Sequence, residues 1–220
     1  MLILSISTAR RFLVTFQNTF LALLFAGAFS THGQDQGRPV VSAKVSLAGE
    51  TIGFDRIVET LVAAFDHADI IALGESHWRK LDSDLRIRVV RHPEFARKVR
   101  LIVVEFASTA QQPILDRYVR GEDVPPEDLQ QVWRNTKGGA GGVWESPVYA
   151  EFFATVREIN KKLPADRRVR VLAGDPPPGG GDRDDSAASI RKEQVLNKGA
   201  KALLVYGSGH LYNFRRGIMT

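Results

Sequence analysis

Four short runs of apolar residues, each followed by a side chain that can move a proton or bind a metal, constrain this chain more than any other feature. A short apolar run that breaks at a glycine or a polar residue is typical of a buried strand. We expect such strands at residues 69–74, 100–105, 168–174 and 202–206. The polar side chains at or just after their ends are Glu75 and His77, Glu105, Asp175, and His210.

The segments between these runs carry apolar residues at helical spacing, most clearly Phe152, Val156, Ile159 and Leu163. Pro113 and Gly121 are expected to begin and end a further helix, and another is expected from Asp184 to Gly199. Strands that alternate with helices predict an α/β fold, a mostly parallel sheet flanked by helices on both faces. Right-handed crossovers then place the C-terminal ends of all strands at one rim of the sheet. We therefore expect the polar strand ends to converge on one site within a single domain, residues 53–214.

The first 33 residues have the order of an export signal. A positive end at Arg10 and Arg11 precedes an apolar segment at 19–29, and small residues follow. An uncleaved membrane anchor is the alternative, although the unbroken apolar stretch is short for a bilayer. We expect cleavage, a periplasmic or secreted protein with no stable membrane span, and a flexible lead-in at residues 34–52.

The chain ends ten residues after His210, and four strands are few for a sheet with helices on both faces. We expect either a short sheet edge or a relative that is truncated at the C-terminus.

Composition excludes several kinds of function. The chain has no cysteine, which excludes disulfides, thiolate metal sites and a cysteine nucleophile. Its net charge is +5, but the basic residues are dispersed among acidic ones and form no stripe. Nucleic-acid binding is therefore not expected. The expected partner is a small-molecule substrate, and any metal would have to be held by His, Asp and Glu.

Glu75 and His77 are two residues apart, so in an extended segment both side chains point the same way. A carboxylate beside an imidazole orients the ring and raises its pKa, which suits a general base. The alternative is a packing role at a strand–helix junction. The neighbouring Trp78 is interpreted as packing or as the wall of a pocket.

Glu105 follows four aliphatic residues, where a carboxylate is costly unless it is paired. It is expected either to form an ion pair with Arg79 or to act as an acid or metal ligand. His210 follows Gly207-Ser208-Gly209, whose glycines allow close backbone approach. Ser208 as a nucleophile is a lesser alternative, because the spacing differs from the Gly-x-Ser-x-Gly elbow. Asp175 either caps the turn before the prolines or contacts substrate.

Three stretches of the sequence carry a family resemblance: Ala72-Leu-Gly-Glu-Ser-His77, Val103-Val-Glu-Phe106 and Tyr206-Gly-Ser-Gly-His210. They resemble the erythromycin esterase-like superfamily, which is related to the ChaN-like haem-binding lipoproteins and to the TIKI/TraB family. The Glu-to-His spacing is one residue shorter than in the esterases and closer to the ChaN-like pattern. The large extra helical region of the esterases is also missing. The resemblance implies a site made of Glu75, His77, Glu105 and His210, with Arg79 as a motif arginine.

Three functional hypotheses follow. The first is an exported esterase-like hydrolase in which His77 is the base, Glu75 and Glu105 orient it or the water, and His210 is the acid or oxyanion partner. Trp78, Arg79, Asp175 and Ser208 would then surround the substrate. The second keeps the same four residues, Glu75, His77, Glu105 and His210, as ligands of a divalent metal that activates water. The third is a non-catalytic ChaN-like module that binds haem or a metal for uptake.

Overall fold

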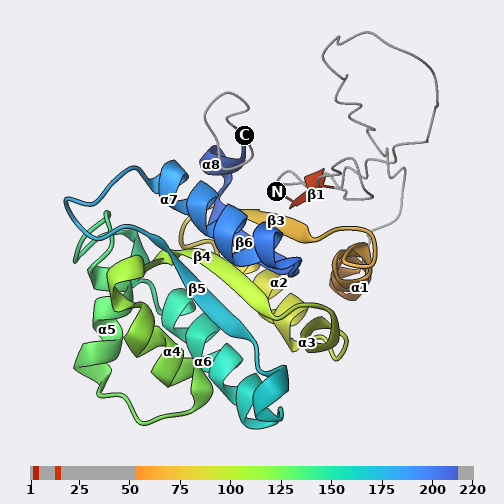
Figure 1. Ribbon diagram of the computed structural model, residues 1–220, viewed down its shortest axis with the longest axis horizontal. Coiled ribbons are helices and arrows are strands. Elements are labelled where there is room, and N and C mark those ends of the chain that lie inside the picture. The colour runs from red at the N-terminus through yellow and green to blue at the C-terminus, as the bar shows by residue number, and fades with distance from the viewer. Residues whose placement is uncertain (1, 5–12, 16–52, 213–220) are drawn as a thin grey trace, which may run out of the picture.

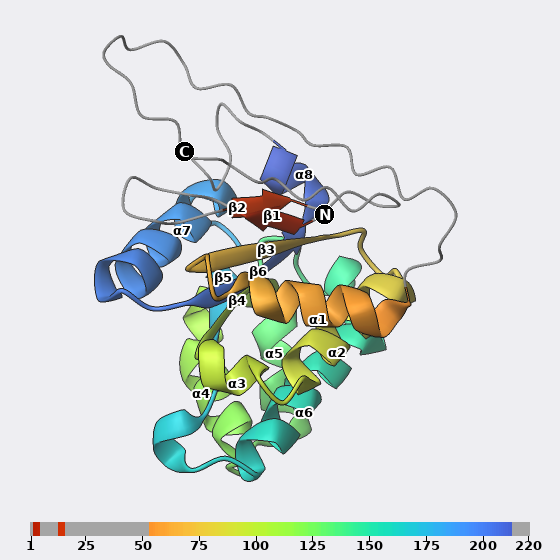
Figure 2. The same cartoon turned by 90° about the vertical axis from the view of Figure 1, so that its right-hand side faces the viewer.

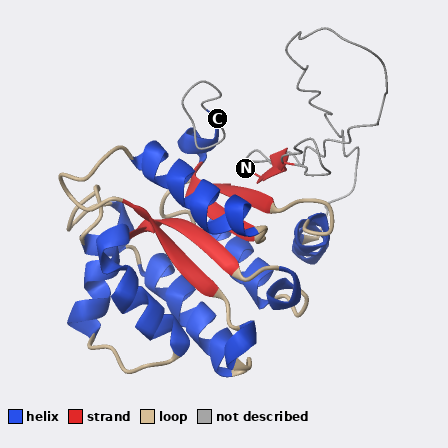
Figure 3. Ribbon diagram, viewed as in Figure 1, coloured by secondary structure: helices blue, strands red, loops and turns tan. Residues whose placement is uncertain are grey.

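A computed structural model describes residues 2–4, 13–15 and 53–212, and shows helices packed around one twisted sheet (Figures 1 and 3). The strands are β1 (Leu2–Leu4), β2 (Leu13–Thr15), β3 (Ile70–Glu75), β4 (Leu101–Ser108), β5 (Arg170–Asp175) and β6 (Ala202–Gly207). The α-helices are α1 (Phe54–Ala64), α2 (Lys80–Arg91), α3 (Phe95–Lys98), α4 (Gln112–Arg120), α5 (Pro126–Arg134), α6 (Pro147–Lys161), α7 (Arg183–Ile190) and α8 (Ser208–Tyr212).

The four strands predicted from the apolar runs are β3, β4, β5 and β6, and every neighbouring pair among them is parallel. Their order in the sheet is β3-β6-β4-β5, so the last strand of the chain lies in the middle. The α/β fold with a mostly parallel sheet is therefore confirmed. The central place of β6 brings its C-terminal end between those of β3 and β4.

The edge of the sheet beyond β3 is formed by two short strands from the start of the chain. β1 pairs antiparallel with β3, and β2 pairs antiparallel with β1. The rest of residues 1–52 lies outside the described residues, so the export signal and the flexible lead-in stay predictions. Within the described part of the chain, no helix has the length and apolar character needed to cross a bilayer.

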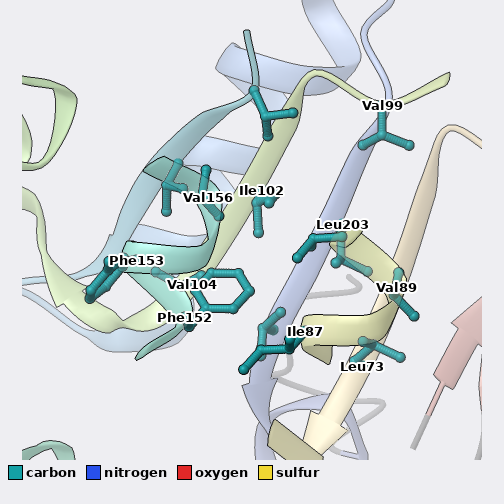
Figure 4. Close-up of a cluster of buried hydrophobic side chains, with 14 of the residues drawn as sticks. Leu73, Ile87, Val89, Val99, Ile102, Val104, Phe152, Phe153, Val156 and Leu203 are labelled. Atoms are coloured by element: carbon teal, nitrogen blue, oxygen red, sulfur yellow. The ribbon is translucent and has the colours of Figure 1, made fainter. Parts of the chain in front are cut away.

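Helices cover both faces of the sheet, as expected, but unequally (Figure 2). Alternate residues of each strand, such as Leu73, Val104 and Leu203, point into a large apolar cluster with helices α1 to α6 (Figure 4). The residues between them, such as Val103 and Leu204, point into a smaller cluster with α7 and the turns that follow it. This alternation is the pattern of a strand that is buried on both faces.

The predicted helices agree with the structure except near the end of the chain. Pro113 lies in the first turn of α4, and Gly121 ends that helix in a left-handed conformation with φ of 101°. The single helix expected from Asp184 to Gly199 is instead α7 followed by a π turn at Arg191–Val195 and a 3-10 turn at Leu196–Lys198. Asp182 caps the N-terminus of α7, and its carboxylate accepts hydrogen bonds from the backbone N–H of Asp184 and Asp185.

Candidate active site

The polar ends of β3, β6 and β4 lie at one rim of the sheet, because these strands are parallel neighbours. Glu75 is the last residue of β3 and pairs in register with Gly207, the last residue of β6. Glu105 lies in β4, on the other side of β6. The end of β6 therefore lies between Glu75 and Glu105, and its side chains decide how closely the surroundings of these two carboxylates approach each other.

Glu75 is buried among charged and aromatic side chains of α2 and α6. Its Oε2 is ion-paired with Nη1 of Arg86, which is itself buried. The hydroxyl of Tyr149 donates a hydrogen bond to Glu75 Oε1 at 3.0 Å, and Nδ1 of His77 lies 3.2 Å from the same oxygen. Burial and the charge of Glu75 raise the pKa of Tyr149, so its phenol remains a donor. The carboxylate is thus fixed to accept the Nδ1 proton of His77, which leaves the lone pair of a neutral ring on Nε2.

Glu105 is buried next to α7 and α8. The backbone N–H of Gly207 donates to its Oε2 at 2.5 Å. Nη1 of Arg183 lies 2.8 Å from Oε1, and Nε2 of His210 lies 3.2 Å from the same oxygen. Nδ1 of His210 faces a second carboxylate, 2.6 Å from Oδ1 of Asp184. Both nitrogens of this imidazole therefore contact acidic side chains.

These contacts change the ionisation of Glu105 and His210 in opposite directions. Burial alone would raise the pKa of Glu105, but the hydrogen bond and charge of His210, with Gly207 and Arg183, hold it below its ordinary value. The hydrogen bond to Glu105 raises the pKa of His210 against the opposing effect of burial, and Asp184 adds to the rise. Each group of the pair therefore favours the charged form of the other.

Alternation along the strands points the two carboxylates toward opposite faces of the sheet. Glu75 follows Leu73 on the face of the large cluster, whereas Glu105 follows Val103 on the face of the smaller one. Their surroundings meet at the rim over Gly207. A Cβ built on Gly207 would lie 3.0 Å from Cε1 of His77, 3.3 Å from its Nε2 and 3.2 Å from Oε2 of Glu105.

The missing side chain at Gly207 thus leaves the space in which His77 approaches Glu105. The structure brings the predicted residues together as two halves, Glu75 with His77 and Glu105 with His210. The imidazoles of His77 and His210 have exposed fractions of 31% and 27%, whereas the carboxylates beneath them have 3% and 0%. Ligands therefore reach the rings first.

The ion pair predicted between Arg79 and Glu105 does not form, and Asp175 has partners that the sequence did not predict. Arg79 is exposed where α2 begins, and Arg183 takes the place beside Glu105 that was expected for it. Asp175 is buried, and its Oδ1 accepts a hydrogen bond from Nε of Arg183 at 2.5 Å. The backbone N–H of Lys137 donates to its Oδ2 at 2.9 Å. Asp175 therefore holds Arg183 in place, and a contact with substrate stays a prediction.

Ser208 and Trp78 follow the ends of β6 and β3 and differ in exposure. Ser208 is the first residue of α8 and is partly buried. Trp78 is 59% exposed and has φ of 66°, a conformation rarely adopted by a bulky residue. Its indole N–H donates to the carbonyl of Val143 at 2.6 Å, which holds the exposed ring in one orientation. Trp133 and Trp144 are buried.

Four polar residues that contact the site were not predicted from the sequence: Arg86, Tyr149, Arg183 and Asp184. A signal existed for Arg86, because it shares one face of α2 with the buried Ser83 and Val90, at spacings of three and four residues. A charged residue at an apolar position of a helix indicates a buried partner. Arg183 and Asp184 look in sequence like any charged helix start.

The fold and this rim define a class: an α/β protein with acid-paired histidines at the C-terminal ends of a parallel sheet. Residues 61–174 match the family described as haem-binding uptake, Tiki superfamily, ChaN. This match covers more than half of the chain, so the chain belongs to that family, and the predicted resemblance to its ChaN and TIKI branches is confirmed. A search of curated proteins found no match.

Solved structures with a similar fold include domains of bacterial effectors. RRSP, a MARTX toxin effector domain from Vibrio vulnificus CMCP6, is 20% identical with a TM-score of 0.44, over 72% of this chain and 31% of that one. The type III effector HopBA1 is 14% identical with a TM-score of 0.46, over 70% of this chain and 72% of that one. This chain therefore spans less than a third of the RRSP chain.

The residues at the rim fit neither a metal nor a haem. Among the described residues, no group of three or more His, Asp or Glu side chains is placed to hold a metal ion. The two central carboxylates, Glu75 and Glu105, are already paired with arginines. Haem needs apolar surface around an imidazole that is free to bind iron. Here His210 has carboxylates at both nitrogens, and Nε2 of His77 lies over Gly207 beside Glu105.

Proposed function

We propose that this protein is an exported hydrolase that cleaves an ester or a related bond with water. One observation carries the proposal: two partly exposed imidazoles each lie 3.2 Å from a buried carboxylate, and one of them, His77, lies over Gly207 close to the carboxylate that is paired with the other. Two titratable rings held in different environments are suited to the separate roles of base and acid. Membership of the ChaN family supports the fold of the site and does not name a substrate.

The reaction uses the two rings in turn. Nε2 of His77 takes a proton from water as the water oxygen attacks the carbonyl carbon. The ester C–O bond then breaks, and the leaving oxygen replaces Glu105 as the partner of His210 Nε2 and takes the proton that this nitrogen carries. His77 afterwards releases its proton to solvent, and His210 regains one. Glu75 stabilises the imidazolium form of His77, and Glu105 stabilises that of His210.

Exposed apolar side chains beside His77 suggest the kind of substrate. Trp78 and Leu81 are both more than half exposed, and Trp78 is held in one orientation by its bond to Val143. An ordered apolar surface next to a base favours a substrate that carries an apolar group beside the scissile bond.

The direct test is hydrolysis of p-nitrophenyl acetate and p-nitrophenyl butyrate by the purified chain, with and without EDTA. We expect hydrolysis of both that survives EDTA, with the butyrate preferred. Activity that EDTA removes and a divalent cation restores would favour the metal-dependent alternative. A haem absorption band at a ratio of one haem per chain, without hydrolysis, would favour the ChaN-like binding module instead.

Adding a methyl group at Gly207 should lower the rate of ester hydrolysis in a chain that still folds. Gly207→Ala places a Cβ within 3.0–3.3 Å of the His77 ring and of Glu105, so these groups must shift by a few tenths of an ångström. We expect ester hydrolysis to fall about tenfold or more, with a stability loss of about 1–3 kcal/mol. Gly209→Ala is the control, because a Cβ there meets nothing within 4 Å. Equal activity in the two variants would show that the space over Gly207 is not used.

A further inference from the structure

The first turn of α7 supplies opposite charges to the two sides of one site. Arg183 contacts the carboxylates of Glu105 and Asp175, whereas the next residue, Asp184, contacts the imidazole of His210. This turn is fixed by the Asp182 cap, which accepts the backbone N–H of Asp184 at 2.8 Å. The backbone that carries both side chains is therefore ordered by a hydrogen bond of its own.

His210 is held at both ring nitrogens. Nδ1 lies 2.6 Å from Asp184 Oδ1, and Nε2 lies 3.2 Å from Glu105 Oε1. A neutral imidazole has one N–H and one lone pair, so it can donate to one carboxylate at most. The imidazolium has two N–H groups, one toward each carboxylate. Asp184 and His210 are about three-quarters buried, so solvent weakens the pair less than it would at the surface.

We propose that Asp184 is a positioning residue that aims Nε2 of His210 at Glu105 and keeps a proton on that nitrogen for transfer. Asp184 acts only through the far nitrogen of the ring and does not itself touch the reacting atoms. The use of that proton in catalysis rests on the proposed hydrolase function, whereas the hold on the ring does not. The imidazole of His210 thus has a carboxylate at each nitrogen, Asp184 at Nδ1 and Glu105 at Nε2.

Several charged and titratable groups surround His210 and share in setting its pKa. The titratable and charged groups that face it are Glu105 from β4, Asp182, Arg183 and Asp184 from the start of α7, and Tyr206 from β6, whose ring centre is 6.4 Å away. The hydrogen bond to Glu105 is the largest cause of the raised pKa of His210, with Asp184 a further cause. Removing the charge of Asp184 therefore lowers that pKa in part.

Asp184→Asn removes the charge and keeps the shape, and Asp185→Asn is the matched control. Asp185 lies in the same turn and is exposed, so it loses the same charge near the start of the same helix. In the full chain with ¹³C-labelled histidine, we expect the NMR titration of His210 to move to lower pH in Asp184→Asn and to stay in place in Asp185→Asn. Hydrolysis of p-nitrophenyl butyrate should fall about tenfold to a hundredfold in Asp184→Asn alone.

A measurement on the unaltered chain tests the proposal even if Asp184→Asn does not fold. Because the pKa of His210 is raised from its ordinary value, ¹⁵N shifts at pH 6.5 should show both ring nitrogens protonated in a larger share of the molecules than for a free histidine. A ring that is mostly neutral at that pH, or an unchanged His210 titration in a folded Asp184→Asn, would overturn the proposal. A shifted titration in a chain that hydrolyses no ester would keep Asp184 as the positioning residue and reject the hydrolase function.

Discussion

Replacing His77 with alanine should reduce ester hydrolysis at least about a hundredfold, because a positioned general base contributes roughly 10²–10⁴ to the rate. The ring contacts Glu75 and the edge of Trp144 and is partly exposed, so its loss leaves the packing of the domain nearly unchanged. We expect the melting temperature to stay the same or to rise, as happens when a group kept for function is removed. Steady-state kinetics and thermal unfolding of the same preparations measure both quantities.

His67→Ala is the control for this variant. His67 is exposed just after α1, away from the rim, so its loss should leave the rate unchanged. An unfolded His77→Ala protein would mean that His77 is a packing residue at the strand–helix junction. A folded His77→Ala protein with full activity would reject His77 as the base.

Replacing Arg86 should have the largest effect on stability of any single change in the site. Its guanidinium is ion-paired with Glu75, donates to the carbonyl of Val148 at 3.1 Å and lies 5.0 Å from the ring centres of Phe106 and Tyr149. Removing one partner of a buried pair leaves the other charge without compensation, which costs about 3–5 kcal/mol. We expect Arg86→Met to lower the free energy of unfolding by this amount in urea titrations.

Two further variants show whether the ion pair causes that loss. Arg88→Met lies in the same helix, but Arg88 pairs with Asp55 in solvent, where such a pair contributes about 0–1 kcal/mol. The double variant Arg86→Met with Glu75→Gln removes both charges and should lose less stability than Arg86→Met alone. A single Arg86→Met variant that costs no more than Arg88→Met would show that Glu75 does not depend on Arg86.

Much of the fold could be predicted because its signals are local. Each buried strand is an apolar run that ends at a polar residue or glycine, and each long helix has a face with a period of 3.6 residues. The parallel arrangement followed from the alternation of strands with helices. The segment after α7 was predicted poorly, since nothing in its sequence distinguishes an α-helix from the π and 3-10 turns that occur there.

The sequence by itself determined which polar side chains lie at the strand ends, namely Glu75, His77, Glu105 and His210, because their order along the chain and a parallel sheet place them at one rim. Only the tertiary structure decided which cation neutralises each buried carboxylate. Arg86 and Arg183 lie in helices, and the rotation of a helix against the sheet depends on the packing of a whole core, not on local spacing. The position of Gly207 is likewise set by the tertiary structure. It ends β6, which lies between β3 and β4, and so it lies between His77 and Glu105. That order of strands exists only in the folded chain.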